Sequence, residues 1–588
     1  MKKILDLMTE QFSKAFAVAG YDEKYGRVTV SNRPDLCEYQ CNGAMAAAKE
    51  YKKAPFMIAD DVAAAISQND MFKSVEVVKP GFINIIVSDS MLSSYINEMA
   101  REEKLGYEAD GSDNIIIDYG GPNVAKPLHV GHLRTAIIGE SLKRIFRFAG
   151  NKVTGDIHLG DWGLQMGLVI EQLHDNKPDL PYYDETFEGE YPKEPPFTLS
   201  ELEQIYPAAS ARSKVEETFK ERAQLATYKL QKGYKPYRAL WKHIMNVSVA
   251  DLRQNYENLN VEFDLWKGES DAEEYIDEMI ADFEAKGLVH ESQGALVADV
   301  KEETDTKEIP PCIIKKSDGA TLYATTDLAT IIMRVKEINP DKIIYVADNR
   351  QEMHFTQVFR VAEKACFSKK AEYIFHGFGT MNGKDGKPFK TREGGIMRLE
   401  NLIAEINEAV YNKIMENRQV SEEEARTIAK TVGLAAVKYG DLSNQASKDY
   451  VFDIDRFTSF EGNTGPYILY TIVRIKSILE KYAQTGKNAD KLSGGVNSEL
   501  NESEKQLMLE LSRFNEMMES AYREMAPHKI CAYIYELSNA FNKFYHENRI
   551  IAEEDEKKQT GYIKLLEVTK RTLEVCIELL GFSAPSKI

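Results

Sequence analysis

The sequence predicts a multidomain α/β protein. A doubly wound parallel sheet with an insertion lies between a small α/β module and an all-α C-terminal region. The length of 588 residues exceeds what one hydrophobic core accommodates. Between residues 111 and 400, short apolar runs alternate with helical patterns, which is typical of parallel sheets with crossover helices. Beyond residue 401 the strand patterns end and long amphipathic helical patterns continue to residue 588.

The N-terminal module, residues 1–110, combines amphipathic helices with two strand-like runs, FKSVEVV and FINIIV. The apolar residues of its helical segments recur at helical spacing in 4–17, 57–68 and 90–103. The linker EADGSDN then separates the module from the region of the parallel sheet.

The parallel sheet is predicted from apolar runs that turn sharply into helical patterns. These runs are 115–118, 152–159, 295–300, 342–348 and 373–379. A stretch from about 173 to 260 opens with several prolines and then becomes charged and helical, so we expect it to be an insertion.

Composition restricts the class of protein. Apolar residues make up 43% and charged residues 28%, which is ordinary for a soluble globular chain, and no run is apolar and long enough to span a bilayer. Six cysteines form no disulfide framework, which favours a reducing cytoplasm. The net charge of −19 argues against general nucleic-acid binding but leaves room for a local basic track. For a chain with large cores of its own, we expect a monomer.

The segment PNVAKPLHVGHL, residues 122–133, places two histidines around a glycine where a strand becomes a helix. A metal pair is one interpretation, but no third ligand and no HExxH pattern accompany it. A buried structural pair is the second. A nucleotide phosphate site is the third and best, because helix N-termini beyond parallel strands bind anions. Gly131 would let a ligand approach the backbone, and the rings of His129 and His132 would donate hydrogen bonds to phosphate oxygens.

HVGH resembles the HIGH motif of class I aminoacyl-tRNA synthetases, and the wider string DYGGPNVAKPLHVGHLRTAIIGESL resembles that of arginyl-tRNA synthetases. Further segments resemble the same family in chain order: GDIHLGDWGLQMG, DGATLYATTDLA, YVADNRQEMHFTQV, DGKPFKTREGG and EGNTGPYILY.

The resemblance implies a class I catalytic, Rossmann-like domain at 111–400, with the N-terminal module and the helical region 401–588 contacting tRNA, the latter at the stem and anticodon. It implies that arginine is activated with ATP and Mg²⁺ to arginyl-adenylate and transferred to the 3′-terminal adenosine of tRNA(Arg). Arginine activation is expected to need bound tRNA. No metal site on the protein is expected.

The resemblance also assigns the ATP-binding and catalytic residues. His129 and His132 would hold ATP phosphates, with Lys126 as an additional cation. The second nucleotide motif of the family, KMSKS, is represented by KPFKT, which keeps both lysines, Lys387 and Lys390. How the three lysines divide the work stays open, and a solvated turn is the alternative for KPFKT. Catalysis would consist of positioning and charge neutralisation.

Arginine recognition calls for carboxylates, because a planar guanidinium offers five donors and no acceptor. By resemblance, Asp118, Tyr323, Asp327 and Gln351 would contact arginine, and Asn123 would bind its main-chain end. Asp118 stands where the family often has Glu. Taken alone, Tyr323 would more often be a core residue and Asp327 a helix N-cap.

Three further segments carry weaker expectations. We expect HLGDWG, residues 158–163, at the floor of the active site. His354 and Gln357 belong to the YVADNRQEMHFTQV motif, and Gln357 also fits a plain helix face. In the C-terminal aromatic segment, where most rings should be core, Tyr545 is our candidate for stacking on a tRNA base.

Three other functions compete with arginine–tRNA ligation. A synthetase for a different amino acid is opposed by the acidic and amide residues at the substrate positions. A catalytically silent tRNA-binding protein is opposed by the intact HVGH, Lys126 and KPFKT. A nicotinamide dehydrogenase is opposed by the absence of G-x-G-x-x-G in the first strand–turn–helix.

Overall fold

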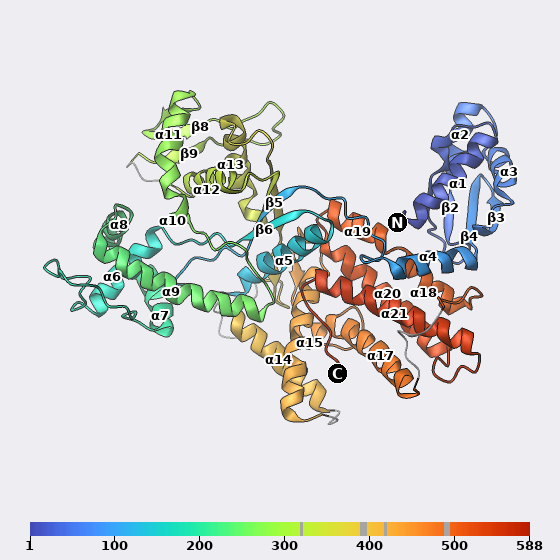
Figure 1. Ribbon diagram of the computed structural model, residues 1–588. Coiled ribbons are helices and arrows are strands. Elements are labelled where there is room, and N and C mark those ends of the chain that lie inside the picture. Colours follow the sequence, from blue (N-terminus) through green and yellow to red (C-terminus); the bar gives the residue numbers. More distant parts are fainter. Residues whose placement is uncertain (318–321, 388–396, 417–419, 487–493) are drawn as a thin grey trace. The chain divides into compact units, whose positions relative to one another are not determined.

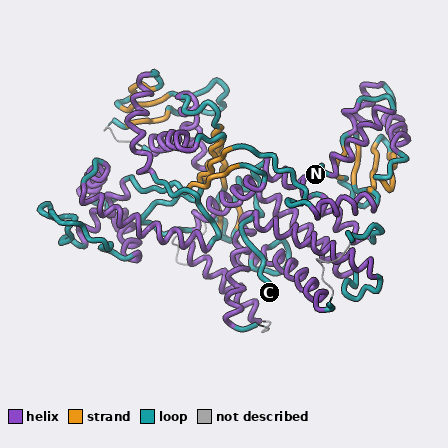
Figure 2. Tube along the Cα trace, viewed as in Figure 1, coloured by secondary structure: helices purple, strands orange, loops and turns teal. Residues whose placement is uncertain are grey.

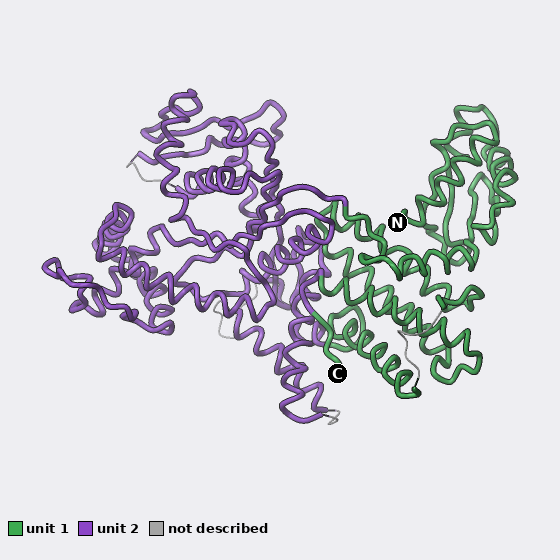
Figure 3. The backbone as a smooth tube through the Cα atoms, viewed as in Figure 1, with its two compact units in different colours: residues 1–109, 459–578, 583–588 green, residues 110–458, 579–582 purple. Residues whose placement is uncertain are grey.

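The computed structural model describes residues 1–317, 322–387, 397–416, 420–486 and 494–588 (Figure 1). The chain forms two compact units, each assembled from separated stretches of sequence (Figure 3). Unit 1 comprises residues 1–109, 459–578 and 583–588, and unit 2 comprises residues 110–458 and 579–582. None of the helices in these ranges is both long and apolar enough to cross a membrane.

The first part of unit 1 combines helices with an antiparallel sheet of four strands, two more than the strand-like runs expected from the sequence. Its strand order is β1-β2-β4-β3. The strands are β1 (Val28–Val30), β2 (Tyr39–Cys41), β3 (Phe72–Val78) and β4 (Phe82–Val87), and the helices are α1 (Ile4–Val18), α2 (Gly43–Tyr51), α3 (Pro55–Ile66) and α4 (Asp89–Arg101). The apolar face of α1, with Met8, Phe12 and Phe16 fully buried, supplies much of this core.

The second part of unit 1 is helical. Its elements are α17 (Gly465–Gln484), α18 (Glu502–Ser512), α19 (Phe514–Arg523), α20 (Pro527–Glu547) and α21 (Glu556–Leu579). Tyr533, Phe541 and Phe544 of α20 are buried, as expected for core aromatics, whereas Tyr545 is 36% exposed.

Unit 2 is built on a parallel sheet with the strand order β11-β10-β5-β6. Figure 2 draws the strands of the protein in orange. Its strands are β5 (Asn114–Asp118), β6 (Lys152–Asp156), β10 (Lys342–Asp348) and β11 (Glu372–Phe378), and its main crossover helices are α5 (Leu133–Phe148), α12 (Tyr323–Ile338) and α13 (Glu352–Ala365). Since β6 and β10 flank β5 on opposite sides, the strand order reverses between β5 and β10. The carboxyl ends of strands at such a switch point border a crevice that binds ligands.

One predicted strand of the parallel sheet lies elsewhere. Residues 295–300 contribute β8 (Ala295–Ala298) to a separate antiparallel sheet with β7 (Val289–Ser292) and β9 (Cys312–Lys315). Gln293 and Gly294 between β7 and β8 both have positive φ, which closes a two-residue hairpin and enforces antiparallel pairing.

The predicted insertion is helical in the structure. It includes α6 (Leu164–Asn176), α7 (Leu199–Arg212), α8 (Glu217–Gln231) and α9 (Lys235–Asn258). After the three-stranded sheet and the parallel strands, the chain continues into α14 (Leu399–Glu416), α15 (Glu422–Leu442) and α16 (Ile454–Phe457). A two-residue strand, β13 (Tyr450–Val451), pairs in parallel with β12 (Met381–Asn382), so strands do not end entirely at residue 400 as the sequence suggested.

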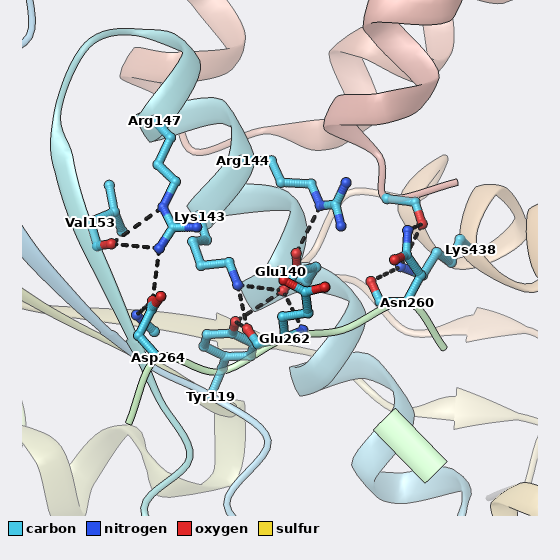
Figure 4. Close-up of polar contacts among 12 residues, drawn as sticks. Tyr119, Glu140, Lys143, Arg144, Arg147, Val153, Asn260, Glu262, Asp264 and Lys438 are labelled. Carbon is cyan, nitrogen blue, oxygen red and sulfur yellow. Dashed lines mark hydrogen bonds and ion pairs between the residues drawn. The ribbon is translucent and has the colours of Figure 1, made fainter. Parts of the chain in front are cut away.

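A buried polar network holds the return segment of the insertion against α5 (Figure 4). Glu140 of α5 accepts hydrogen bonds from the Tyr119 hydroxyl at 3.0 Å and the Glu262 backbone N–H at 3.1 Å, and it forms ion pairs with Lys143 and Arg144 at 2.9 and 2.7 Å. Because Tyr119 directly follows the last residue of β5, this network fixes the strand end that borders the crevice.

Residues 579–582 are hydrogen-bonded beside the same network. Lys438 of α15, which is fully buried, donates hydrogen bonds to the backbone oxygens of Asn260 at 3.1 Å and Gly581 at 2.8 Å (Figure 4). Ser141 donates a hydrogen bond to the Leu579 oxygen at 2.9 Å. Burial lowers the pKa of Lys438 to about 7.

Candidate active site

A cavity of about 830 Å³ opens at the carboxyl ends of β5 and β10. Most of the candidate residues lie around it. They are Asp118, Asn123, His129, Gly131, His132, Tyr323, Asp327 and Gln351. The switch point predicted for a parallel sheet is therefore the place where the sequence candidates meet.

The two histidines stand on a turn that leads into α5. His129 precedes the 3-10 turn η2 (Val130–His132), and the Nδ1 atom of His129 accepts the Gly131 N–H at 3.0 Å. The Nδ1 atom of His132 accepts the His129 N–H at 3.2 Å, and the ring centroids are 4.0 Å apart. Because both Nδ1 atoms accept, the proton of each neutral ring lies on Nε2, where it can be donated to a ligand.

Electrostatics keep both rings neutral. Burial lowers the pKa of His132 to about 3, with further lowering by His129 and Lys126. Burial also lowers the pKa of His129, followed by the charge of Lys126. In the described ranges, no group of three or more His, Cys, Asp or Glu side chains is placed to hold a metal ion. The pair is arranged as two uncharged donors at a helix N-terminus.

The backbone beside the histidines is paired with the segment that follows the KPFKT motif. Val130 N–H donates to the Met397 oxygen at 3.1 Å, and Leu399 N–H donates to the Leu128 oxygen at 3.0 Å. The residues on both sides of HVGH are therefore fixed to the chain that returns from the second nucleotide motif.

The candidate lysines Lys126 and Lys387 have different surroundings. The ammonium of Lys126 lies 4.6 Å from the centre of the Tyr206 ring of α7, and its charge influences both histidines. Lys387 is described in a turn in which its N–H donates to Asp385 at 3.1 Å and its carbonyl accepts from Gly383 at 2.8 Å. Lys390 lies outside the described residues.

Asp118 already has a guanidinium partner within the protein. Arg334 of α12 donates from Nη2 to Asp118 at 2.6 Å and to Asp156 at 2.8 Å, and the centre of the Tyr345 ring is 5.3 Å from the guanidinium carbon. Burial raises the pKa of Asp118, and Arg334 opposes that shift. Arg334 was not among the residues predicted from the sequence, although an arginine inside the apolar run IIMRV is a signal for a buried ion pair.

The cavity is also lined by two carboxylates, those of Asp327 and Glu269, that pair with no described Lys or Arg. Tyr323 is 66% exposed, and Asp327 lies inside α12 rather than at its N-cap, so neither alternative from the sequence holds. His354 contacts Asp327 at 2.5 Å. Glu269, which the sequence analysis missed, also lines the cavity. Burial, with the charges of Asp161 and Asp327, raises the pKa of Glu269 to about 7.

The HLGDWG segment is divided between the cavity and the core. His158 and Gly160 line the cavity, and Gly160 pairs with Asn123 in a parallel bridge. Asp161 and Trp162 are 1% and 2% exposed and are not among the lining residues, so the expected floor consists of the first part of the motif only. Gln357, from the other weakly assigned motif, donates to the Pro310 oxygen at 2.8 Å on a helix face.

Three family models match the chain in order. Residues 2–87 match the arginyl tRNA synthetase N-terminal domain, residues 95–454 match the catalytic domain of class I (R) tRNA synthetases, and residues 468–588 match the DALR anticodon binding domain. The chain belongs to the arginyl-tRNA synthetase family.

Relatives of the synthetase agree over the full length. An arginine–tRNA ligase from Agathobacter rectalis is 63% identical and covers all of both chains, and one from Alkaliphilus oremlandii is 58% identical over 99% of this chain and all of the relative. Among solved structures, arginyl-tRNA synthetase from Plasmodium falciparum aligns over all of both chains with a TM-score of 0.80 at 24% identity. The Thermus thermophilus arginyl-tRNA synthetase aligns over all of both chains with a TM-score of 0.77 at 21% identity, and both show the same fold.

The tRNA candidate of the synthetase, Tyr545, lies on the surface of unit 1. The guanidinium carbon of Arg474 lies 5.2 Å from the centre of the Tyr545 ring and 4.7 Å from that of Tyr470, which is 40% exposed. Arg474 also donates to Asn542 at 2.6 Å. Exposed aromatic rings with an arginine between them suit base stacking.

Proposed function

We propose that this arginine–tRNA ligase activates arginine with ATP in the cavity of unit 2 and then transfers the arginyl group from the adenylate to the 3′-terminal adenosine of tRNA(Arg). One observation carries the proposal. The same cavity has two neutral imidazole donors at a helix N-terminus and, elsewhere, the carboxylates of Glu269 and Asp327, which form no ion pair with any described Lys or Arg. The first set suits phosphates and the second suits a guanidinium.

At the phosphate end, the Nε2–H groups of His129 and His132 would donate to ATP oxygens while the arginine carboxylate attacks the α-phosphorus and pyrophosphate leaves. Gly131 leaves the backbone accessible there. Lys126, Lys387 and Lys390 would neutralise the charge that develops on the leaving phosphates. The geometry requires no nucleophile from the protein, so catalysis is positioning and electrostatic stabilisation.

At the arginine end, Glu269 and Asp327 would accept the guanidinium N–H groups, beside the hydroxyl of Tyr323. Asn123, next to the phosphate end, would bind the main-chain end of arginine, with Gln351 as a further polar contact. Asp118 would contribute its remaining acceptor capacity, because Arg334 already occupies its Oδ2 atom.

The proposal also includes the place of Mg²⁺, the contact with tRNA, the oligomeric state and the compartment. Mg²⁺ would be held by the ATP phosphates, which are its usual partners at nucleotide sites. Tyr545 would stack on a tRNA base, within a helical region, 401–588, that contacts the stem and the anticodon. We further propose a monomer that works in the cytoplasm, consistent with the free thiols of Cys37 and Cys41.

The test is ATP–pyrophosphate exchange with arginine, with and without tRNA(Arg), using lysine and citrulline as controls. We expect exchange with arginine only in the presence of tRNA. Citrulline has the shape of arginine without its charge, so its exclusion would demonstrate recognition by the carboxylates. Exchange with a different amino acid would refute the arginine assignment, and tRNA binding without any exchange would refute the activation step.

A further inference from the structure

Glu269 stands on a short helix whose Asp271 side chain accepts the Gly268 N–H at 2.8 Å, while its N-cap residue offers no side-chain acceptor to the first turn. It opens α10 (Glu269–Ala272), whose N-cap residue is Gly268. The first N–H groups of a helix need acceptors, and a glycine has no side chain to offer one. The orientation of the Glu269 carboxylate therefore depends on what holds these N–H groups from outside.

Asp161 provides the missing acceptor. Its Oδ1 atom accepts the backbone N–H of Ser270 at 3.0 Å, and its Oδ2 atom accepts the Ser270 hydroxyl at 2.6 Å. The side chain is buried, and a Cβ atom on Gly268 would lie 2.6 Å from Oδ1. The close approach of Asp161 to the helix thus requires the glycine.

The backbone around Asp161 is itself paired with the segment that carries Glu269. Leu159 N–H donates to the Lys267 oxygen at 2.8 Å, and Glu269 N–H donates to the Leu159 oxygen at 3.0 Å. The backbone N–H of Trp162 faces the Glu269 carboxylate and lowers its pKa, against the larger effect of burial. The glutamate is attached to HLGDWG at both its backbone and its side chain.

The insertion fixes Asp161 and Trp162 from the other side. Trp241 of α9 donates from its indole N–H to the backbone oxygen of Asp161 at 3.0 Å, and Gln231 of α8 donates to the backbone oxygen of Trp162 at 2.9 Å. The guanidinium carbon of Arg238 lies 4.3 Å from the centre of the Trp162 ring. Such supports leave the Asp161 side chain little freedom to follow a displaced helix.

We infer that Asp161 is a positioning residue for arginine selection: by holding the first turn of α10 through Ser270, it sets where the Glu269 carboxylate stands in the cavity. Asp161 itself is not among the residues that line the cavity, so it acts through Glu269 rather than on the substrate. The inference rests on the proposed role of Glu269 in guanidinium binding.

The experiment compares Asp161→Asn, Ser270→Ala, Ser270→Thr and Glu269→Gln in arginine charging of tRNA, with Asp282→Asn on the exposed face of α11 (Ile276–Ala285) as the matched control. We expect Glu269→Gln to raise KM for arginine by about 100-fold, because one partner of a buried charged pair is lost. Asp161→Asn and Ser270→Ala should each raise it by about tenfold, with KM for ATP unchanged. Ser270→Thr, which keeps the hydroxyl, should restore a normal KM.

A pH profile separates positioning from a general loss of structure. The ionisable groups facing Glu269 are Asp161 from the loop after β6, and Asp327 and Tyr323 from α12. Since the charge of Asp161 raises the pKa of Glu269, Asp161→Asn should move the acid limb of kcat/KM for arginine to lower pH, whereas Ser270→Ala should not. A merely structural defect would lower kcat and raise KM for ATP without moving the limb.

The outcomes are distinguishable. An unchanged KM for arginine in Glu269→Gln would refute the proposed role of Glu269 itself. A raised KM in that variant, together with control-like arginine kinetics and an unmoved acid limb in Asp161→Asn, would overturn the inference alone. If Asp161→Asn does not fold, Ser270→Ala decides: a KM for arginine equal to that of Asp282→Asn overturns the inference.

Discussion

Asp118 and Glu269 are carboxylates of the same cavity with opposite surroundings. Asp118 shares the Arg334 guanidinium with Asp156, whereas Glu269 faces Asp161 and Asp327, and no described Lys or Arg pairs with it. A buried carboxylate needs a counter-charge, because burial disfavours the ionised form. The protein itself supplies that cation to Asp118. Under the proposed function, we expect the arginine substrate to supply it to Glu269, so that Glu269 contributes more to arginine selection than Asp118.

Removing the internal cation should make the Asp118 site resemble the Glu269 site. Arg334→Met leaves two buried carboxylates without a partner, and we expect unit 2 to lose about 3–5 kcal/mol of its free energy of unfolding. Tryptophan fluorescence during denaturation reports this, since Trp162, Trp241 and Trp266 all lie in unit 2.

The stability of Arg334→Met should also depend on pH. In the variant, burial would still raise the pKa of Asp118 and the opposing effect of Arg334 would be gone, so the folded protein would bind an extra proton there. The stability lost should therefore be smaller at pH 5 than at pH 8. Arg426→Met, which removes two exposed ion pairs in unit 2, is the control and should lose less than about 1 kcal/mol. Equal losses of unfolding free energy in Arg334→Met and Arg426→Met would show that Asp118 and Asp156 do not depend on Arg334 as their internal counter-charge.

The phosphate end should respond independently of both carboxylates. His132→Ala removes an Nε2–H donor whose contact strengthens as charge develops on the phosphates. We expect the activation rate to fall by about 10²–10³-fold. KM for arginine should stay within about twofold, as measured by tRNA-supported pyrophosphate exchange. His290→Ala, at an exposed ion pair, should retain normal exchange. If the activation rate and the affinity for arginine fell together, His132 would not act specifically on the phosphates.

Acidification should affect arginine use through Glu269. Its pKa is about 7 in the unliganded protein, and only the carboxylate attracts a guanidinium. We expect kcat/KM for arginine to fall about tenfold per pH unit below pH 7 and to be flat above it. His132, with a pKa of about 3, cannot produce this limb. At saturating arginine, kcat should hold to lower pH, since the bound guanidinium lowers the pKa of Glu269. A kcat/KM that is flat down to pH 5.5 would argue against the assignment.

Asp118 should be less sensitive than Glu269. In Asp118→Asn the amide oxygen can still accept from Arg334, and Asp156 keeps the guanidinium neutralised. We expect KM for arginine to rise about fivefold, the effect of one modest hydrogen bond. Titration of arginine in charging assays measures it. An increase as large as that of Glu269→Gln would mean that Asp118 selects the guanidinium after all.

The smallest expected effect lies in unit 1. Tyr545→Ala should raise KM for tRNA by about fivefold, the loss of weak base stacking, and leave KM for arginine unchanged. Tyr545→Phe keeps the ring and is the matched control. If the alanine variant charges tRNA with an unchanged KM, Tyr545 does not stack on a tRNA base.

Much of the fold followed from local patterns. The strands β5 and β10 were predicted to within one residue, because parallel strands buried on both faces are short continuous apolar runs. The run 295–300 was assigned to the wrong sheet, since its pairing is decided by the Gln293-Gly294 turn and not by the run itself.

The lining of the candidate site was predictable where a motif supplied it. The histidines and Asp327 occur in motifs with fixed spacing, and the structure gathers them around one cavity. Glu269 could not be found in this way, because it follows an irregular segment and its environment is made by residues about a hundred positions earlier. Partnerships between distant segments, such as that of Arg334 with Asp118, are set by the tertiary fold.

Residues 579–582 belong to unit 2, although the rest of that unit ends at residue 458. A ribosome therefore makes all the helices of unit 1 before it supplies the last piece of the catalytic unit. Lys438, Ser141 and Asn260, which bind that piece, remain without these acceptors until then. Unit 2 therefore cannot complete its folding until these residues have been synthesised, and a chain truncated within α21 would lack the acceptors that they provide.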